Sequence, residues 1–423
     1  MKKIIITPAK LHGRAAAPPS KSHTHRLLAA AALSDAPCRV ENAGTSADIE
    51  ATAACLRALG AEVRREGNDL LVTPIRTDNG LKHPEMDCGE SGTTLRFMAP
   101  LAAALCDEVT LTGRGRLSER PMEELLRAMA DHGTTASSGH VPITLRGRLR
   151  PGLFELPGNV SSQYVSGLLF ALPLLEEASE IRLTTALSSS GYVAMTLDVL
   201  KRSGITIEET ECGYRVPGGQ RYHAPALTRA EGDWSGSAFW LAAGAICGPV
   251  TVTGLNPASL HRDRVVTDLL RRFGAEVRTG QDGVTVSGGS LRGITADLDQ
   301  IPDLALPLAA AAAFAEGETV FRNCGRLRLK ESDRLEAIRK VLAGFGIRTE
   351  VTGSRSDELR IFGGRPKGCG AESFHDHRVA MMAAILASGA EGPTVTDDPQ
   401  CVAKSYPGFF DDFRALGGAA DEI

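Results

Sequence analysis

A weak sixfold internal repeat constrains the fold of this chain more than any other feature. Each unit begins with an alanine- or leucine-rich helical segment, followed by a short β-like run, a polar loop, a second helical segment that ends near a glycine, and more β-like residues. The fifth unit shows the pattern in DLALPLAAAAAFAEG, ETVFRN, CGRLRLKESDRLEAIRKVLAGFG, IRTEV and ELRIF. Because this period is longer than that of a thin solenoid, we predict that each unit is a βαβαββ module.

Polar residues recur at a fixed spacing at the two expected helix starts of each unit. The first helices are expected to start near residues 21, 92, 161, 235, 303 and 377, in nearly equal steps along the chain. The second start follows at one constant separation in the pairs Gly92–Arg120, Ser161–Ser189, Ser235–Asp263 and Asp303–Glu331, and at almost the same separation in His377–Lys404. Equal spacing on equal elements predicts equivalent positions on one face of each unit.

The two ends of the chain predict a discontinuous domain. We expect no terminal strand after FFDDFRALGGAADEI in the sixth unit, whereas KKIIITP at the N-terminus is typical of a strand that has no unit of its own. This strand is expected to complete the last units. The predicted domains are residues 1–20 with 228–423, which hold units four to six, and an inserted domain of residues 21–227, which holds units one to three. Two chain crossings between them predict a hinge and a cleft.

Composition limits the possible partners. A net charge of −4 gives no global basic field for nucleic acid or an anionic membrane, so an anion site must be a local cluster. Nine cysteines without a C-x-x-C pair argue against a disulfide framework and a zinc site and favour a reducing, cytoplasmic location. The segment MKKIIITPAK has too few consecutive apolar residues for a signal peptide. The longest apolar run, LALPLAAAAAFA, is too short for a membrane span and predicts a buried helix.

Cations and hydroxyl groups gather at the expected helix starts of five units. KESDRLEAIRK places Lys330, Glu331 and Arg334 at a helix start, where the dipole is already positive and added cations are unfavourable unless an anion binds. The other starts carry Lys21, Ser22 and Arg26; Glu90, Gly92, Thr93 and Arg96; Arg120, before Pro121 at a favoured first helical position; Ser161, Ser162 and Gln163; Ser189 and Tyr192; Asp303; and His377, Arg378 and Lys404. We interpret them as a trap for phosphate and carboxylate groups.

Ordinary structural roles are an alternative for several of these residues taken singly. Ser235, Asp376 and either Ser332 or Asp333 are typical of helix N-caps, and Gly92 is typical of a tight turn. Asp333 beside Arg334 predicts a structural ion pair. Lys404 alone and the four histidines His23, His25, His375 and His377 are more typical of surface or capping positions. Recurrence of cations at one structural point in five units favours the anion site over independent surface scatter.

Two acids interrupt the cationic pattern, Asp303 and Glu331, at the paired starts of the fifth unit. A carboxylate among Lys21, Lys330 and Arg334 would stay ionised and act as a base, or pass a proton through a neighbouring lysine. One acid pair within an anion trap predicts proton chemistry on a phosphorylated carboxylate.

These residues resemble the enolpyruvyl transferases, and within them the branch that acts on shikimate 3-phosphate, over almost the whole chain. The resemblance rests on nine segments in the family's order: PPSKSHTHR, GESGTTLRF, SERPMEEL, GNVSSQYVSGLL, EGDWSGSAFWL, IPDLAL, RLKESDRLEA, DHRVAMM and DPQCVAKSYPGFF. It implies an α/β, inside-out barrel-like fold of two domains, each of three βαβαββ units, with the active-site cleft between them.

The resemblance also implies an activity. The enolpyruvyl group of phosphoenolpyruvate would be transferred to the 5-hydroxyl of shikimate 3-phosphate by addition and elimination, with release of phosphate, in the shikimate pathway of aromatic amino acid biosynthesis. It implies no metal or organic cofactor. The expected partners are these two small molecules, without nucleic acid or membrane, and the expected oligomeric state is a monomer.

By matching motifs, the resemblance assigns roles to single residues. Asp303 is implied as the base for the attacking hydroxyl, Glu331 as the group that handles the methylene proton, and Lys21 as a third catalytic residue that touches both substrates. Shikimate 3-phosphate ligands are implied at Lys21, Ser22, Arg26, Ser161, Ser162, Gln163, Ser189, Asp303 and Lys330. Phosphoenolpyruvate ligands are implied at Lys21, Gly92, Arg120, Gln163, Arg334, Arg378 and Lys404.

Three positions depart from the family's pattern. Glu90 stands where many members have Asn, and we expect it to pair with Arg120 or Lys21 or to tune the response to inhibitors. Arg326 replaces an expected polar amide, and SSSGY lacks the usual basic residue and proline before Tyr192. The sister enzyme that uses UDP-N-acetylglucosamine carries a reactive cysteine on a loop of its second unit, where this chain has GRGRLSERP. A non-catalytic anion-binding protein is the other alternative, and acids facing an anion argue against it.

Overall fold

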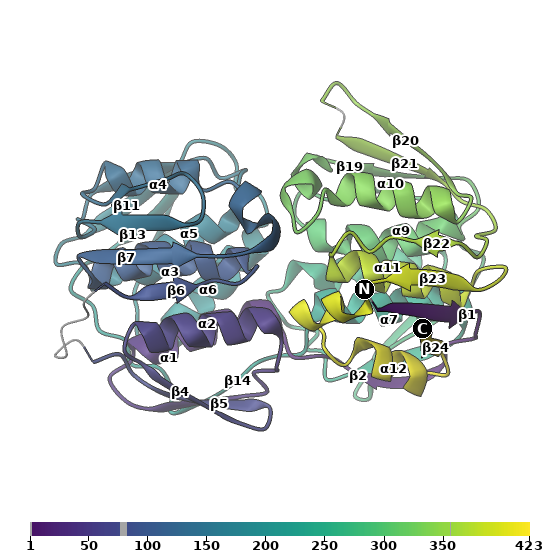
Figure 1. The fold of residues 1–423 in the computed structure, drawn as a ribbon, viewed down its shortest axis with the longest axis horizontal. Helices are drawn as coiled ribbons and strands as arrows, with labels where there is room; N and C mark the ends of the chain where they lie inside the picture. Colours follow the sequence, from purple (N-terminus) through teal and green to yellow (C-terminus); the bar gives the residue numbers. More distant parts are fainter. Residues whose placement is uncertain (1, 77–82, 356) are drawn as a thin grey trace. The chain divides into compact units, whose positions relative to one another are not determined.

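The computed structural model describes residues 2–76, 83–355 and 357–423, and its chain forms two compact units (Figure 1). Unit 1 comprises Met1–Pro18 and Glu231–Ile423, and unit 2 comprises Pro19–Ala230. The boundaries expected from the repeat, 20/21 and 227/228, lie two and three residues from these. Each unit has its own hydrophobic core.

Unit 2 contains three repeats of the same element order. The first comprises α1 (Lys21–Leu33), β3 (Cys38–Glu41), α2 (Ala47–Ala58), β4 (Glu62–Glu66), β5 (Asp69–Thr73) and β14 (Leu227–Arg229). The second comprises β6 (Glu85–Asp87), α3 (Gly92–Leu105), β7 (Glu108–Thr112), the 3-10 helix η2 (Gly115–Glu119), α4 (Glu123–Ala130), β8 (Thr135–Ala136) and β9 (Ile143–Arg146). The third comprises β10 (Leu153–Leu156), α5 (Ser162–Ala171), η3 (Leu172–Leu174), β11 (Ser179–Leu183), α6 (Ser190–Arg202), β12 (Glu208–Thr210) and β13 (Gly213–Val216).

Unit 1 contains the other three. The fourth repeat comprises β2 (Gly13–Ala16), α7 (Trp234–Cys247), β15 (Val250–Thr253), η4 (Arg262–Val265), α8 (Val266–Phe273), β16 (Glu276–Gly280) and β17 (Gly283–Ser287). The fifth comprises β18 (Thr295–Asp297), η5 (Pro302–Leu304), α9 (Ala305–Ala313), β19 (Glu318–Arg322), η6 (Gly325–Leu329), α10 (Arg334–Gly344), β20 (Arg348–Thr352) and β21 (Glu358–Phe362). The sixth comprises β22 (Gly370–Ala371), α11 (His377–Ser388), β23 (Thr394–Asp397), η7 (Pro399–Lys404), α12 (Phe409–Ala415), β24 (Ala419–Glu422) and β1 (Lys3–Thr7).

The described residues form six four-stranded sheets, one for each repeat, with a single topology. In β6-β7-β9-β8, the first two strands are parallel, and the hairpin strands β8 and β9 are antiparallel, with β9 next to β7. Three sheets borrow a strand from a distant part of the chain: β14 pairs with β3, β2 with β15, and β1 with both β23 and β24. The repeat and the completing role of the N-terminal strand are therefore confirmed.

One expectation about the sixth repeat is wrong. The C-terminal residues Ala419–Glu422 do form a strand, β24, and β1 lies between it and β23. The register pairs Ile4 with Thr396 on one side and with Glu422 on the other. The short polar segment AADE gives little strand signal by itself, and its pairing with the apolar β1 decides its conformation.

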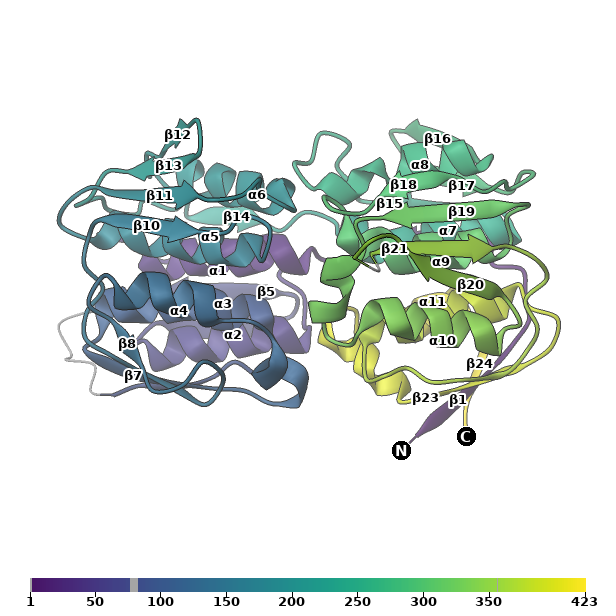
Figure 2. The ribbon, with the colours of Figure 1, turned by 90° about the horizontal axis from the view of Figure 1, so that it is seen from above.

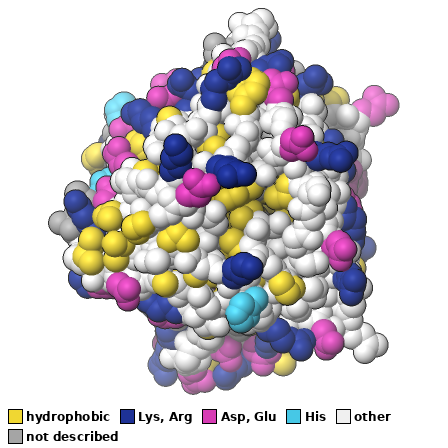
Figure 3. All heavy atoms as spheres, turned by 90° about the vertical axis from the view of Figure 1, so that its right-hand side faces the viewer, with side chains coloured by type: hydrophobic (Ala, Val, Ile, Leu, Met, Phe, Trp, Pro, Cys, Tyr) yellow, Lys and Arg dark blue, Asp and Glu magenta, His cyan; other side chains and the backbone are white. Residues whose placement is uncertain are grey.

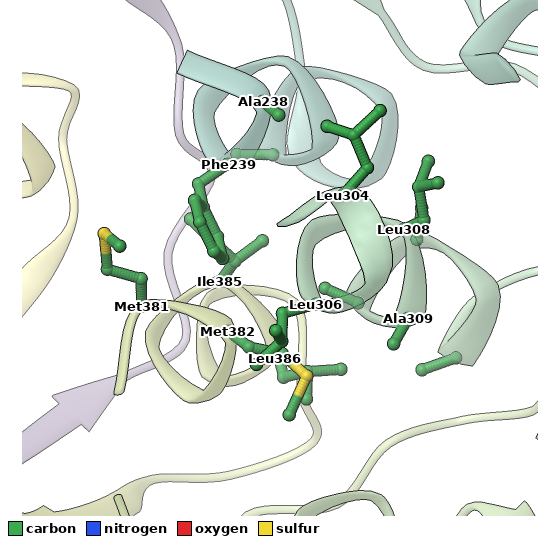
Figure 4. Packing of buried hydrophobic residues seen from close by; sticks show 14 of the residues in the cluster. Ala238, Phe239, Leu304, Leu306, Leu308, Ala309, Met381, Met382, Ile385 and Leu386 are labelled. Atoms are coloured by element: carbon green, nitrogen blue, oxygen red, sulfur yellow. The ribbon is translucent and has the colours of Figure 1, made fainter. Parts of the chain in front are cut away.

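The core of each unit is helical, and the sheets lie outside it, as the inside-out architecture predicts (Figure 2). Strands such as β15 alternate buried and half-buried residues, whereas every residue of α9 is buried. A helix that is apolar all round must be enclosed by protein, and the alanines of α9 allow its neighbours to approach closely. Figure 4 shows Phe239 of α7, Leu306 of α9, and Ile385 and Leu386 of α11 meeting there. The predicted burial of the apolar run 304–315 is largely confirmed, with Phe314 half-buried.

The helix lengths and the distribution of surface charge agree with the expectations from the composition. In the part of the chain that the structure describes, no helix is both long enough and apolar enough to span a membrane. The face of the molecule in Figure 3 carries Lys and Arg interspersed with Asp and Glu, so neither sign of charge dominates there.

Candidate functional site

The start of α1 in unit 2 presents the first group of predicted residues. Ser20 caps the helix by accepting a hydrogen bond from the backbone N–H of His23, and Lys21 and Ser22 follow as its first residues. The Nζ atom of Lys21 lies 2.7 Å from Oδ2 of Asp48, near the start of α2. Lys21 therefore has a fixed partner, and its amino group is held at the N-terminal end of both helices.

Arg26, one turn further along α1, is buried among neutral groups. It donates to Oγ1 of Thr196 at 2.7 Å, to the carbonyl of Ser22 at 2.6 Å and to the carbonyl of Tyr192 at 2.9 Å. No acid within the described ranges forms an ion pair with it, and burial lowers its pKa to about 10. A buried cation without a carboxylate is costly unless an anion compensates it, which supports the predicted role as a phosphate ligand.

The first turn of α3 is held by side chains from other elements. Gly92 begins the helix, and the guanidinium of Arg120 lies directly over it, so close that a Cβ on Gly92 would stand 2.5 Å from Nη1. Gln163 of α5 donates to Oγ1 of Thr93 at 2.7 Å and accepts from Arg96 at 2.7 Å. Gly92 thus makes room for Arg120, whereas the predicted alternative was a tight turn.

Three serines mark the starts of α5 and α6. Ser161 is the N-cap of α5 and accepts from the backbone N–H of Gln163 at 3.3 Å, and Ser162 is the first residue of the helix. Ser189 precedes α6 in the left-handed conformation, with φ of 56°. A non-glycine residue in this region stores strain, which is typical of functional positions. All three side chains are buried and belong to the same unit as Arg26.

In unit 1, a network of acids and cations surrounds Arg334, the first residue of α10. Its Nη1 donates to Oδ1 of Asp303 at 2.9 Å, its Nη2 lies 2.8 Å from Oε2 of Glu331, and its Nε donates to Oδ2 of Asp376 at 2.8 Å. Burial alone would lower the pKa of Arg334, but Asp376, Glu331 and Asp303 together raise it. The guanidinium therefore orients both predicted catalytic acids.

Asp303 is ionised in this setting. Lys330 Nζ lies 3.8 Å from its Oδ1, and Arg378 Nη2 lies 3.7 Å from its Oδ2. Burial would raise its pKa, but Arg378, Lys330 and Arg334 hold the pKa well below its usual value. For Lys330, burial outweighs the attraction of Asp303 and lowers the pKa to about 8. The expected cationic surroundings of Asp303 are confirmed for Lys330 and Arg334, with Arg378 in addition, whereas the partner found for Lys21 is Asp48 in unit 2.

Several predicted helix starts are wrong by about one turn. Arg120, Glu331 and Lys404 lie at the ends of, or just after, the 3-10 helices η2, η6 and η7, before α4, α10 and α12 begin. Pro121 consequently lies outside α4, which begins at Glu123. Short 3-10 helices are common just before an α-helix, and the 3.6-residue spacing of apolar residues does not show where the 3-10 helix ends and the α-helix begins.

The caps also differ in part. Asp376 caps α11, as predicted, by accepting from the N–H of Arg378 at 2.9 Å. Of the two caps expected for α10, Asp333 is the one found, and Ser332 donates to Asp376 at 3.0 Å. Asp233 caps α7 in place of Ser235, which donates to Asp263 at 2.6 Å. Asp333 pairs with Arg328 at 3.1 Å, so the ion pair expected between Asp333 and Arg334 is replaced by others.

The remaining residues named from the sequence are partly or largely buried, and they lie in different parts of the two units. Arg378 and Lys404 are largely buried in unit 1, near the starts of α11 and α12. The side chain of Glu90 packs against Gly115 at the start of η2, and Arg326 donates to the carbonyl of Asp299 at 3.3 Å. Tyr192 contributes its carbonyl to Arg26 and its ring lies 5.8 Å from that guanidinium.

Sequence reasoning missed Asp48 and gave Asp376, Arg96 and Asp263 less weight than the structure does, and all four are buried. Asp48 follows Lys21 at the same separation along the chain as Lys404 follows His377, so the repeat did carry its signal. Asp376 was expected only as a cap. Arg96 lies four residues after Gly92 inside an apolar run. Asp263 is buried and accepts from Ser235, and its pKa is raised, first by burial. For Arg96 and Asp263 the sequence gave only a position near an expected helix start, without the partners that the structure shows.

Six sheets over helical cores, with cations and hydroxyl groups at the helix starts of unit 2 and an acid–cation network in unit 1, place the chain in the class of enolpyruvyl transferases. Within that class the chain belongs to the EPSP synthase (3-phosphoshikimate 1-carboxyvinyltransferase) family, whose model matches residues 5–413.

Relatives and solved structures agree with this family. The 3-phosphoshikimate 1-carboxyvinyltransferase of Clostridium kluyveri is 40% identical over 426 residues, covering 100% of this chain and 99% of its own. That of Clostridium acetobutylicum is 38% identical, with 100% and 99% covered. The fold is similar to EPSP synthase from Acinetobacter baumannii, with a TM-score of 0.81, 24% identity and full coverage of both chains. It is also similar to the enolpyruvyl transferase NikO from Streptomyces tendae, with a TM-score of 0.80, 21% identity, and 100% and 99% covered.

Proposed function

We propose that the chain transfers the enolpyruvyl group of phosphoenolpyruvate to the 5-hydroxyl of shikimate 3-phosphate and releases inorganic phosphate. The single observation that carries this proposal is the position of the Asp303 carboxylate, which accepts a hydrogen bond from Arg334 within a cluster that also contains Lys330 and Arg378. A base set among cations suits a reaction in which an alcohol must lose a proton beside a phosphorylated carboxylate.

The proposed mechanism follows from the states of these groups. Asp303 accepts the proton of the 5-hydroxyl of shikimate 3-phosphate as the hydroxyl oxygen forms a bond to the central enol carbon of phosphoenolpyruvate. The methylene carbon gains a proton in a step assigned to Glu331. The tetrahedral intermediate then loses phosphate and returns a methyl proton, which restores the enol double bond. Arg334 links the two acids, which keeps both carboxylates oriented through the two proton transfers.

Substrate recognition is assigned to groups whose charge or hydrogen bonds suit anions. We assign the phosphate of shikimate 3-phosphate to Ser161, Ser162 and the compensating cation Arg26, with Ser22, Gln163, Ser189 and Lys330 as further ligands. We assign phosphoenolpyruvate to Lys21, Gly92, Arg120, Gln163, Arg334, Arg378 and Lys404. The buried starts of α1, α3 and α5 support these assignments, because unpaired helix N–H groups favour phosphate and carboxylate.

The test is phosphate release from phosphoenolpyruvate, measured with shikimate 3-phosphate and UDP-N-acetylglucosamine as separate acceptors. Release only with the shikimate ester is the expected result, and release only with the nucleotide sugar would overturn the acceptor. Lys21→Met should abolish turnover, whereas Lys201→Met, at an exposed position in the same unit, should leave it unchanged. Asp303→Ala should lower kcat about 10²–10⁴-fold with a smaller change in binding, as expected for loss of a general base. A near-normal rate in either variant would refute its role.

We also propose that the protein acts as a monomer in the cytoplasm. The nine free cysteines of the chain support a reducing compartment. Light scattering after size exclusion tests the oligomeric state, and a mass near the 44.7 kDa of one chain is the expected result.

A further inference from the structure

Four buried polar side chains form a continuous hydrogen-bonded row in unit 2, which we call the ladder: His25, Thr52, Thr94 and Ser91. Nδ1 of His25 lies 2.7 Å from Oγ1 of Thr52, and that atom lies 2.7 Å from Oγ1 of Thr94. Thr94 Oγ1 donates to Oγ of Ser91 at 2.8 Å. None of the four side chains is more than 1% exposed. The ladder therefore crosses the interior of the unit and does not lie on its surface.

The donors and acceptors of the ladder run in one direction. Each hydroxyl has a single proton, and that of Thr94 is committed to Ser91, so Thr94 must accept from Thr52. Thr52 must then accept from His25, which requires the proton on Nδ1. Nε2 of His25 has no hydrogen-bond partner among the described residues, as this tautomer permits for an acceptor in an apolar interior. Burial, Lys21 and Arg26 keep the pKa of His25 well below its usual value, so the imidazole stays neutral.

The ladder runs one helical turn behind the groups assigned to phosphoenolpyruvate. His25 lies four residues after Lys21 on α1, and Thr52 lies four residues after Asp48 on α2, so the two pairs stack on the same helix faces. Two contacts thus tie α1 to α2. Thr94 then ties α2 to the first turn of α3.

Ser91, the last member, is itself the N-cap of α3. Its Oγ accepts from the N–H of Thr94 at 3.2 Å as well as from the Thr94 hydroxyl. The residue after it is Gly92, which lies beneath Arg120. The conformation of the turn that places Gly92 beneath Arg120 is therefore set from inside by the ladder, while Gln163 holds the neighbouring Thr93 from the other side.

We propose that the ladder is a positioning device for the phosphoenolpyruvate subsite, in which His25 and Thr52 fix the cap and first turn of α3 relative to Lys21. This inference rests on the proposed function, since it gives that reaction its positioning residues. A buried polar row of this kind is expensive to maintain compared with apolar packing, because every member must be satisfied at once. Its members do not touch the substrate, and they act through Ser91, Gly92 and Lys21.

The test compares three variants. Thr52→Val keeps the shape of the side chain but removes both central hydrogen bonds, and Thr52→Ser restores the hydroxyl. Thr110→Val is the matched control, because it removes another threonine pair of the same unit, between Thr110 and Thr144 at 3.2 Å on β7 and β9. We expect Thr52→Val to raise the KM for phosphoenolpyruvate about tenfold while the KM for shikimate 3-phosphate changes less than about twofold, because a misplaced turn affects only its own subsite. Thr52→Ser should return the KM to near the wild-type value.

A general loss of stability would give a different result. If Thr52→Val lowers Tm but leaves the ratio of the two KM values unchanged, or if Thr110→Val raises the KM for phosphoenolpyruvate equally, the positioning role is wrong. NMR of ¹⁵N-labelled protein gives a second readout that does not depend on turnover. The Nδ1–H signal of His25 should disappear and the amide signal of Gly92 should shift in Thr52→Val only, and unchanged spectra would overturn the inference. A wild-type protein that releases no phosphate with shikimate 3-phosphate would refute the proposed function and leave the spectral test of the ladder standing.

Discussion

Replacing Gly92 with alanine should weaken phosphoenolpyruvate binding without destabilising the fold. A Cβ at this position would stand 2.5 Å from Nη1, 2.6 Å from Cζ and 2.8 Å from Nη2 of Arg120, whereas ordinary contact begins near 3.4 Å. These three nearest atoms all belong to one long side chain, which can move. The guanidinium must therefore retreat by about 1 Å, while the backbone of α3 keeps its place.

The size of the effect follows from the geometry of a charge-assisted hydrogen bond. A displacement of this size lengthens a hydrogen bond between the guanidinium and phosphoenolpyruvate from about 2.8 Å to more than about 3.5 Å. At that distance the two groups no longer form a hydrogen bond. Losing one hydrogen bond to a charged group costs about 1.5–3 kcal/mol, which corresponds to a roughly 10- to 150-fold higher Kd. The free energy of unfolding should stay the same or rise by up to about 1 kcal/mol, because alanine loses less backbone entropy than glycine.

The assay is a double-mutant cycle on the KM for phosphoenolpyruvate. Gly92→Ala and Arg120→Ala are measured singly and together, with Tm as the control for folding. Since the effect of the alanine acts through Arg120, Gly92→Ala should add little in the Arg120→Ala background. Equal losses in both backgrounds, or a lowered Tm that accounts for the loss, would refute the reasoning.

Two further predictions concern unit 1. Because the pKa of Lys330 is about 8, kcat/KM for shikimate 3-phosphate should fall above pH 8 as the amine loses its charge. Lys330→Arg should move this fall to higher pH, because the guanidinium stays charged. A fall that stays near pH 8 in the variant would exclude Lys330 as its cause. Asp376→Asn should lower the free energy of unfolding by about 3–5 kcal/mol in urea titrations at pH 7, because it leaves Arg334 buried with less compensation. The pKa of Asp376 is about 2, below its unfolded value, so the stability that this shift contributes is present above pH 4 and is lost as the pH falls toward 2. The shift corresponds to roughly 2 kcal/mol, so the difference between the two proteins should narrow by that amount, and a constant difference would contradict the linkage.

The sequence predicted the fold well wherever helices carried the signal. The first helices start within two residues of the positions expected from the repeat, because each is largely buried and all except α9 begin at a residue whose side chain caps the helix. The short strands β2 and β14 were missed, because four residues of GRAA and three of LTR have no alternation strong enough to recognise. Their conformation comes from parallel pairing with β15 and β3, which lie in distant parts of the sequence.

For the candidate site, the sequence predicted which residues gather but not all of their partners. Residue types and spacing predicted which side chains gather at the helix starts, since the repeat places equivalent positions on one face. The ion network was predicted only in part. Asp303 was expected beside Lys330 and Arg334, but the pairing of Arg334 with Glu331 and Asp376 in place of its sequence neighbour Asp333 depends on tertiary packing. Asp333 is instead used locally, as the cap of its own helix. Spacing identifies candidates, whereas burial decides between partners.

The central place of β1 in the last sheet has a consequence for biosynthesis. Unit 2 is one continuous stretch and can fold as soon as Ala230 leaves the ribosome, but β1 must wait for β23 and β24. At about 5–20 residues per second, the strand KIIIT stays unpaired for roughly 20–80 s while the rest of the chain is made. Such a segment is prone to pair with other nascent chains. Lys3 begins it and Lys2 and Lys10 flank it, and their charge discourages this pairing. β1 is therefore made long before both strands that it pairs with, and this interval exposes the folding of unit 1 to mispairing.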